Sequence, residues 1–347
     1  MSELARGEVL LRATDVKKHF PVRGGLLHRR GERPVVHAVD GVSLEVRRGE
    51  TLGVVGESGC GKSTLGRCLV RLTDLTSGRV EFAGQDITTL SRRQLRPVRR
   101  DVQLVFQDPY ASLNPRRRVG DVVAEPLQIH QFGSPAQVTK RVAELFDVVG
   151  LSPSHVDRFP HEFSGGQRQR VGIARALAMN PRLIVADEPV SALDVSIQAQ
   201  VLNLFADLQD DLGLTYVFIA HDLGVVRHVS DRIAVMYLGE VVEVADADPL
   251  YDAPAHPYTE ALLSAAPEID DGTQELPRDR IVLTGDVPNP VDKPTGCPFH
   301  PRCPYAVQRC RDERPPLTEV APGRLAACHF PLVTLTGEPA AHAVAGL

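Results

Sequence analysis

One stretch of the chain has the residue types and the spacing of a phosphate-binding loop. Residues 56–64, Gly-Glu-Ser-Gly-Cys-Gly-Lys-Ser-Thr, match the pattern G-x-x-x-x-G-K-[ST]. The apolar run 51–55 before them predicts a buried strand, and apolar residues at helical spacing in 65–72 predict a helix after them. Glycines let backbone N–H groups close around phosphate oxygens, and a helix N-terminus adds partial positive charge. The segment is therefore predicted to bind the phosphates of a nucleotide.

Individual side chains of this loop have expected roles. Lys62 should reach the outer phosphates, and the Ser63 hydroxyl can be a ligand of Mg²⁺. The other residues expected to line the nucleotide are Gly56, Ser58, Gly59, Cys60, Gly61 and Thr64. Hydrolysis of a phosphate bond needs no thiol, so Cys60 and Cys68 are expected to be packing residues. The alternative, a glycine-rich turn before a structural helix, is disfavoured because all four fixed positions occur in a strand–loop–helix context.

Two carboxylates end a second apolar strand. Residues 183–186 are all apolar, as in a parallel-sheet strand that is buried on both faces, and Asp187 and Glu188 follow them. Asp187 is expected to support the Mg²⁺ shell, and Glu188 to polarise the attacking water. Taken alone, the pair could be a surface acidic pair after a strand. The phosphate-binding loop upstream favours the catalytic interpretation.

A third segment predicts a helix N-terminus that can meet a phosphate. Ser164 is a good N-cap residue, and Gly165 and Gly166 let the backbone approach another group closely. Gln167 follows, and an apolar-periodic segment continues to about residue 177. Such a terminus suits a γ-phosphate, although composition alone also allows a merely capped helix.

The surrounding pattern predicts an α/β core with a mostly parallel sheet, preceded by an antiparallel region. Strands are expected at 9–20, 35–46, 78–82, 104–109, 183–186 and 215–220, and helices at 120–150 and 195–212. The basic segment 92–100 is expected to be a solvated helix face. Residues 22–34, rich in Gly and Arg, are expected to form a solvated loop.

Composition and charge limit the class of protein and the cellular compartment to which the chain is expected to belong. The chain has 347 residues, enough for about two domains, and a net charge of −5 argues against a general nucleic-acid binder. No apolar run approaches the roughly 20 residues that span a bilayer, and residues 1–6 lack the apolar core of a signal peptide. The protein is expected to stay in the cytosol, where its six cysteines would not form disulfides.

The amino-acid composition changes after about residue 245, where Pro, Asp and Ala become frequent. The only clear helix predicted there is 257–265. Four cysteines gather in this part of the chain: Cys297, Cys303, Cys310 and Cys328. In the cytosol, a structural metal site can stabilise a segment that has little hydrophobic core. Zinc, a [4Fe–4S] cluster and unliganded thiols all remain open, although the tight C-x₂₋₄-C pairs usual for zinc are absent. We expect an ATPase domain at 1–265, a cysteine-bearing extension at 266–333 and a flexible tail at 334–347.

Six motifs occur in the order found in ATP-binding-cassette (ABC) ATPases, which the chain resembles. They are the loop 56–64, Gln107, Ser164–Gln167, Asp187-Glu188, Ser191–Asp194 and His221. The resemblance implies a P-loop NTPase fold of the ABC type, with an antiparallel β subdomain and a helical subdomain. It also implies a head-to-tail dimer with two ATP molecules at the interface, where the Ser164–Gln167 helix of one subunit covers the γ-phosphate held by the other.

The same resemblance assigns roles to single residues. Glu188, His221, Gln107 and Lys62 would be catalytic, with His221 holding the γ-phosphate and the water. Gln107 would sense the γ-phosphate and join Ser63 and Asp187 at Mg²⁺. Asp194 would bridge the two halves of the dimer. Phe20 occupies the place of the aromatic residue that stacks on adenine, although plain core packing is an alternative for it. No catalytic position departs from the pattern of the family.

The resemblance narrows to the oligopeptide/dipeptide importer ATPases. It rests on the segments 56–63, 106–116, 160–170 and 256–263. Residues 24–30 and 35–43 resemble the second of the two ATPases that such importers usually carry. In similar proteins the segment 296–304 is associated with a [4Fe–4S] cluster.

The function implied is ATP-powered uptake of oligopeptides or dipeptides. The implied partners are a second ABC ATPase, two transmembrane permease subunits and, through them, an extracytoplasmic substrate-binding protein, with this chain peripheral on the cytoplasmic face of the membrane. Two alternatives remain: the same class of importer for nickel chelates, glutathione or oligosaccharides, and a non-transport cassette ATPase acting on ribosomes or DNA. Substrate choice lies in other chains, so this sequence leaves the transported solute open.

Overall fold

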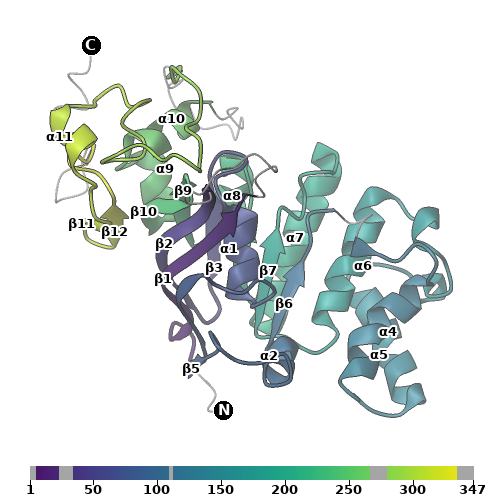
Figure 1. Ribbon diagram of the computed structural model, residues 1–347. Coiled ribbons are helices and arrows are strands. Elements are labelled where there is room, and N and C mark those ends of the chain that lie inside the picture. The colour runs from purple at the N-terminus through teal and green to yellow at the C-terminus, as the bar shows by residue number, and fades with distance from the viewer. Residues whose placement is uncertain (1–4, 23–33, 109–111, 266–279, 334–347) are drawn as a thin grey trace. The chain divides into compact units, whose positions relative to one another are not determined.

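The chain divides into two units. Short apolar runs of the sequence form the strands at the centre of the first unit. The computed structural model describes residues 5–22, 34–108, 112–265 and 280–333 (Figure 1). The first unit comprises Met1–Leu10, Val46–Thr51 and Thr89–Ile219, and the second comprises Leu11–Glu45, Leu52–Thr88 and Ala220–Leu347. Most of the expected loop at 22–34 and the whole expected tail at 334–347 lie outside the described residues.

The strands of the first unit are parallel, as their apolar character predicts. β6 (Val102–Val105) pairs with β7 (Leu183–Asp187), which pairs with β8 (Thr215–Ile219). Every residue of β7 and β8 is buried, which is the pattern of strands covered on both faces. Because parallel strands end at one edge of a sheet, residues that follow β6 and β7 are brought to the same edge.

The helices of the first unit confirm the helical prediction for 120–150 and add to it. The helices are α2 (Leu95–Asp101), α4 (Val119–Ile129), α5 (Pro135–Val148), α6 (Gly165–Leu177) and α7 (Val195–Leu212). Two short 3₁₀ turns, Pro153–His155 and Pro160–Glu162, precede α6. α4, α5 and α6 pack against one another as a helical group (Figure 1). α2 buries Leu95 and Val98 and leaves Arg96 and Arg100 exposed, as expected of a solvated basic face.

The second unit contains the expected antiparallel region. Its four strands lie in the order β2-β1-β4-β5, formed by Val35–Arg47, Val9–Pro21, Ser77–Phe82 and Gln85–Asp86. β1 and β4 pair antiparallel, with Leu11 opposite Phe82 and Ala13 opposite Val80. The side chains of Leu11, Ala13, Val80 and Phe82 are all buried, so the alternating pattern of the sequence places one face of this sheet in the core.

A second sheet of this unit carries the phosphate-binding loop. β3 (Thr51–Val55) is parallel to β9 (Arg232–Tyr237), and β10 (Glu240–Asp246) is antiparallel to β9. β12 (Arg324–Ala326) and β11 (Thr318–Ala321) then extend this sheet along β10 (Figure 1). The helices of the unit are α1 (Lys62–Leu69), α8 (Leu223–Val229), α9 (Ala247–Asp252), α10 (Pro257–Ala265) and α11 (Gln308–Asp312).

The prediction of a single helix after residue 245 was wrong. α10 forms where it was expected, but α9 and α11 are also helical. With 6 and 5 residues, α9 and α11 are too short to show the 3.6-residue period from which a helix is inferred. Among the described helices, none combines the length and the apolar character needed to cross a membrane.

Candidate nucleotide site and thiol pocket

The phosphate-binding loop has the backbone that its glycines predict. It follows the buried strand β3 and leads into α1 at Lys62. Gly56 has φ +149°, and a Cβ there would lie 2.2 Å from the Met236 carbonyl oxygen. Gly61 has φ +105°, and a Cβ there would lie 2.0 Å from the Ala38 carbonyl oxygen. Only glycine fits either position, so the loop is shaped by close backbone packing as well as by turn geometry.

The ammonium of Lys62 already lies inside this loop. Lys62 is 4 % exposed, and its Nζ donates hydrogen bonds to the carbonyl oxygens of Gly56 at 2.7 Å and Glu57 at 3.0 Å. The loop thus holds the desolvated ammonium of Lys62 in place. There it can exchange these carbonyl oxygens for the phosphate oxygens of a nucleotide. The nearby Cys60 is buried, and burial raises the pKa of its thiol, which agrees with a packing role.

In the first unit, Glu188 stands at the end of β7 in a strained backbone conformation. Asp187 is 1 % exposed, whereas Glu188 is half-buried. Glu188 has φ +47°, a region that non-glycine residues rarely occupy, and its N–H donates to the Ile219 carbonyl oxygen at 2.9 Å. Such strain costs on the order of 1–3 kcal/mol and is concentrated at functional sites. The turn directs two successive carboxylates into different environments.

The structure brings Gln107 and Glu188 together, as expected of residues that follow neighbouring parallel strands. The side-chain Nε2 of Gln107 donates to Oε2 of Glu188 at 2.7 Å. The Glu188 carbonyl oxygen accepts from the Ser191 hydroxyl at 3.0 Å, which fixes the turn that follows β7. Gln107 therefore orients the carboxylate that is predicted to polarise water.

The N-terminus of α6 is capped as predicted. The Ser164 hydroxyl accepts from the Gln167 N–H at 3.3 Å, and the Gln167 side chain accepts from the Ser164 N–H at 3.0 Å. A Cβ on Gly166 would lie 2.4 Å from Cγ2 of Ile197, and one on Gly165 would lie 3.3 Å from Cδ2 of Leu193. The two glycines thus let the start of α6 pack against the segment that leads into α7.

The remaining predicted residues are accessible to a ligand or a partner. Asp194 is the exposed N-cap residue of α7 and makes no side-chain capping bond. Phe20 is 41 % exposed at the end of β1, with Lys18 Nζ 4.9 Å from its ring centre, so its ring is not packed in the core. His221 is exposed and precedes Asp222, whose carboxylate caps α8.

The predicted nucleotide residues fall into two groups, one in each unit. The first unit carries Gln107, Ser164–Gln167, Asp187, Glu188 and Asp194, and the second carries Phe20, the loop 56–64 and His221. Within each group the local geometry suits its predicted chemistry: a cationic loop for phosphate in the second unit, and an oriented carboxylate and a capped helix terminus in the first.

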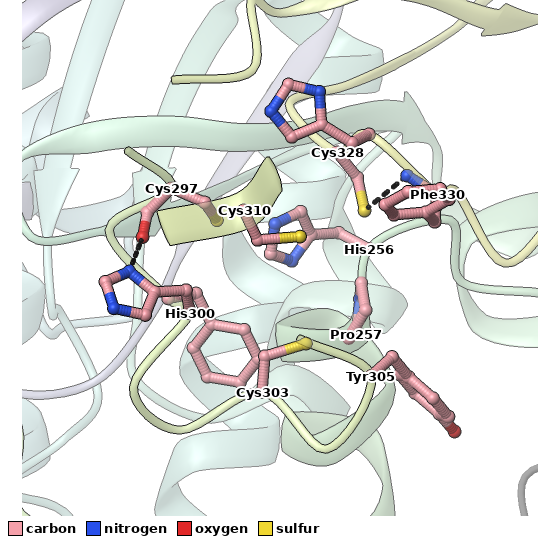
Figure 2. A pocket seen from close by; sticks show the side chains of 11 residues that line it. His256, Pro257, Cys297, His300, Cys303, Tyr305, Cys310, Cys328 and Phe330 are labelled. Atoms are coloured by element: carbon pink, nitrogen blue, oxygen red, sulfur yellow. Dashed lines mark hydrogen bonds between the residues drawn. The ribbon is translucent and has the colours of Figure 1, made fainter. Parts of the chain in front are cut away.

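The four late cysteines meet in one pocket of the second unit, although the first and the last are 31 positions apart. Cys297, Cys303, Cys310 and Cys328 line it together with His256, Pro257, Phe299, His300, Tyr305, His329 and Phe330. Figure 2 shows the sulfur atoms of Cys303, Cys310 and Cys328 turned into a common space. The Phe330 N–H donates to the Cys328 sulfur at 3.4 Å. We call this site the thiol pocket.

The four cysteines that line the thiol pocket are the residues that could hold a metal group there. Among the described residues, the only set of three ligand atoms within 4.8 Å of one another is that of His19, His37 and Asp40, so no three of the sulfurs are that close. Tetrahedral zinc with Zn–S of about 2.3 Å would need sulfurs about 3.8 Å apart. The pKa of Cys303 and of Cys328 is raised to about 12, mainly by burial, and the charges of neighbouring cysteines contribute to this increase. A cationic centre would be needed to keep these thiols ionised.

Sequence reasoning did not identify a polar cluster in the antiparallel sheet of β1 and β2. His19 and His37 were expected to be surface or hydrogen-bonded residues without metal spacing. His19 of β1 is indeed hydrogen-bonded to Asp40 of β2, and His37 lies three residues before Asp40 in the same strand. His19 Nε2 lies 3.1 Å from Asp40 Oδ1, and Lys293 Nζ donates to Asp40 Oδ2 at 2.9 Å. Burial raises the pKa of Asp40, but the hydrogen bond and charge of Lys293 and the bond to His19 outweigh burial and hold the pKa at about 2. The Lys293 ammonium already neutralises this carboxylate, so the cluster is a structural ion pair.

Comparison with known proteins matches two regions of the chain to described families. The family model described as "ABC transporter" matches residues 39–191, and the one described as "Oligopeptide/dipeptide transporter, C-terminal region" matches residues 242–310. The chain is 54 % identical over 328 residues to the oligopeptide transport ATP-binding protein AppF of Bacillus subtilis, covering 94 % of this chain and 98 % of that one. It is 52 % identical over 322 residues to the di/tripeptide transport ATP-binding protein DppF of Pseudomonas aeruginosa, covering 93 % and 98 %.

A solved structure shows the same fold. The ATP-binding cassette MJ0796, in a dimeric post-hydrolysis state bound to ADP and phosphate, aligns with a TM-score of 0.60 at 32 % identity over 69 % of this chain and 99 % of that one. The chain belongs to the ATP-binding subunits of ABC transporters. Within that family it carries the C-terminal region of the oligopeptide/dipeptide transporters, and like the family it is an ATPase.

Proposed function

We propose that this chain hydrolyses ATP to power the uptake of oligopeptides or dipeptides through a membrane permease. The observation that carries the proposal is the pairing of an ABC ATPase region with a peptide-transporter C-terminal region in one chain. Similar proteins from Bacillus subtilis and Pseudomonas aeruginosa are named for oligopeptide and di/tripeptide transport. These names favour peptides over nickel chelates, glutathione or oligosaccharides, and favour transport over action on ribosomes or DNA.

In this proposal each group of site residues has one task. Lys62 and the glycine loop hold the β- and γ-phosphates, Ser63 and Asp187 serve Mg²⁺ with Gln107, and Phe20 stacks on the adenine. Mg²⁺, when bound, neutralises phosphate charge. Glu188, oriented by Gln107 at 2.7 Å, accepts a proton from the attacking water.

Closure of two ATPase subunits supplies the coupling. The capped N-terminus at Ser164–Gln167 would cover the γ-phosphate held by the partner, and the exposed Asp194 would meet the partner across the interface. His221 would complete the site. ATP binding would favour the closed pair, and hydrolysis would release it, which is a ligand-driven shift between two states.

The partners follow from the same assignment. We propose a second ABC ATPase as the other half of the dimer, two transmembrane permease subunits and a substrate-binding protein outside the membrane. The chain would lie on the cytoplasmic face. The thiol pocket would hold a [4Fe–4S] cluster through its four cysteines, which the wide spacing of the sulfurs favours over zinc.

Native co-purification tests the transport proposal. A tagged chain is extracted from membranes of its own host in mild detergent, and the proteins that accompany it are identified. Two multispanning proteins and a second cassette ATPase are expected, and deletion of the chain should abolish uptake of a labelled tripeptide. Ribosomal or DNA-repair proteins without membrane subunits would contradict transport, and unchanged peptide uptake would contradict the substrate class.

A further inference from the structure

The segment that carries the thiol pocket reaches the phosphate-binding loop directly. Arg302 precedes Cys303, and its guanidinium forms a two-pronged ion pair with Glu57, the second residue of the loop. Nη1 lies 2.8 Å from Oε2, and Nη2 lies 3.0 Å from Oε1. The side chains of Arg302 and Glu57 are only 8 % and 25 % exposed. A bidentate pair shielded from solvent fixes geometry far more firmly than a surface ion pair does.

Glu57 is held at three points. Besides the ion pair, its backbone N–H donates to the hydroxyl of Tyr258 at 2.9 Å. Its carbonyl oxygen accepts from the ammonium of Lys62 at 3.0 Å. One residue of the loop therefore connects the phosphate-binding lysine with two side chains from the C-terminal part of the chain.

The residues that hold Glu57 are sequence neighbours of residues that line the thiol pocket: Arg302 precedes Cys303, and Tyr258 follows Pro257. Tyr258 follows His256 and Pro257, which line the pocket, and Phe299 lies in the short segment between Cys297 and Cys303. The Phe299 ring centre is 5.3 Å from that of Tyr258, and both rings are almost fully buried. Figure 2 shows Cys303, Pro257 and His256 around the same space. The pocket wall and the support of the loop are thus one packed group.

We propose that Arg302 and Tyr258 are positioning residues that hold the phosphate-binding loop in its nucleotide-binding shape, and that occupation of the thiol pocket strengthens ATP binding through them. The second part rests on the proposed metal group of the pocket. Ligation of Cys297 and Cys303 would anchor the chain on both sides of Arg302. A loop that is already ordered loses less conformational entropy when it binds phosphate. By linkage, ATP must strengthen retention of the metal group by the same factor.

Titration of the purified chain with a fluorescent ATP analogue tests the positioning role. Arg302→Gln is expected to weaken binding about tenfold, because it removes a charge-assisted bidentate contact, and Arg302→Lys to restore part of the loss. KM for ATP should rise while kcat at saturating ATP stays within about twofold. Arg12→Gln, which breaks an exposed ion pair with Glu45 in the same unit, is the matched control and should bind as the parent does.

Two further variants keep the test decisive if Arg302→Gln folds poorly. Glu57→Gln should reproduce the loss, and the double variant of Glu57 and Arg302 should be no worse than either single one. Tyr258→Phe removes only the hydroxyl and should weaken binding about threefold. Unaltered affinity in Arg302→Gln, or in Tyr258→Phe, would overturn the positioning role.

The coupling is tested on the same chain purified without oxygen, before and after removal of its metal by a chelator. Iron content and visible absorption define the two forms. The stripped form should bind the ATP analogue more weakly, and in Arg302→Gln the two forms should bind alike. Equal affinity of the two parent forms would overturn the coupling. A chain that contains no metal but loses affinity in Arg302→Gln would contradict the metal proposal and the coupling, while supporting the positioning role.

Discussion

Gly166 and Gly172 of α6 provide a matched pair of Gly→Ala variants. Comparing them measures the effect of close packing at the start of α6, the helix N-terminus that is proposed to cover the γ-phosphate. A Cβ on Gly166 would lie 2.4 Å from Cγ2 of Ile197, a separation that real Cβ contacts do not show. A Cβ on Gly172, in the same helix, would meet no heavy atom within 4 Å other than the nearby backbone of that helix. Gly172→Ala, in the interior of α6, gains about 1 kcal/mol of helix propensity, and Gly166→Ala, at the second residue of the helix, gains no more than that. Only Gly166→Ala also incurs an overpacking cost of about 1–3 kcal/mol.

The difference in stability between the two variants is therefore at least the overpacking cost. At about 2–4 °C per kcal/mol for a unit of this size, Gly166→Ala should melt about 2–12 °C below Gly172→Ala in differential scanning calorimetry. The start of α6 must also move to relieve the contact, so Gly166→Ala should lose most ATPase activity at a temperature where both variants are folded. Equal melting temperatures would refute the packing argument. Full activity in Gly166→Ala would refute the placement of this terminus at the nucleotide.

Two further variants probe the second unit. Lys62→Ala should weaken ATP binding about 10- to 100-fold in the same fluorescence titration, because it removes charge-assisted hydrogen bonds of about 1.5–3 kcal/mol; unaltered binding would contradict the role of the loop. Asp40→Asn should destabilise the protein by about 2 kcal/mol at pH 7, because the Lys293 and His19 contacts lower the Asp40 pKa from 3.8 to about 2. A lowered acid pKa stabilises the folded state above the unfolded pKa. The difference in melting temperature between parent and variant should therefore shrink as pH falls from about 4 toward 2, and a constant difference would contradict the ion-pair explanation.

Local patterns predicted the elements that carry the nucleotide chemistry. The glycine spacing of residues 56–61 predicted a loop whose positive φ angles and close backbone contacts the structure shows. The N-cap preference of Ser164 predicted the start of α6, and the all-apolar run 183–186 predicted a buried parallel strand. These predictions succeed because capping, turn geometry and burial of a short strand depend on residues close in sequence.

Contacts between residues that are far apart in the sequence could not be predicted from such local patterns. The ion pair of Arg302 and Glu57 joins residues 245 positions apart, and nothing in the spacing of either residue indicates it. The same holds for the cluster of His19 and Asp40 with Lys293, which depends on strand pairing and on the path of the C-terminal segment. Resemblance identified residues 256–263 as typical of the family, but only the structure gives a physical reason for Tyr258: its hydroxyl supports the phosphate-binding loop.

The central claim is that Glu188 drives ATP hydrolysis in this chain, and Glu188→Gln tests it most directly. Glutamine keeps the shape of the side chain and can still pair with Gln107, so folding and ATP binding should match the parent. The loss of the proton acceptor should lower ATP hydrolysis in the purified complex by about 10²–10⁴-fold. Tight ATP binding with hydrolysis reduced by that factor would support the account. Hydrolysis within a few fold of the parent, measured as phosphate release, would contradict it.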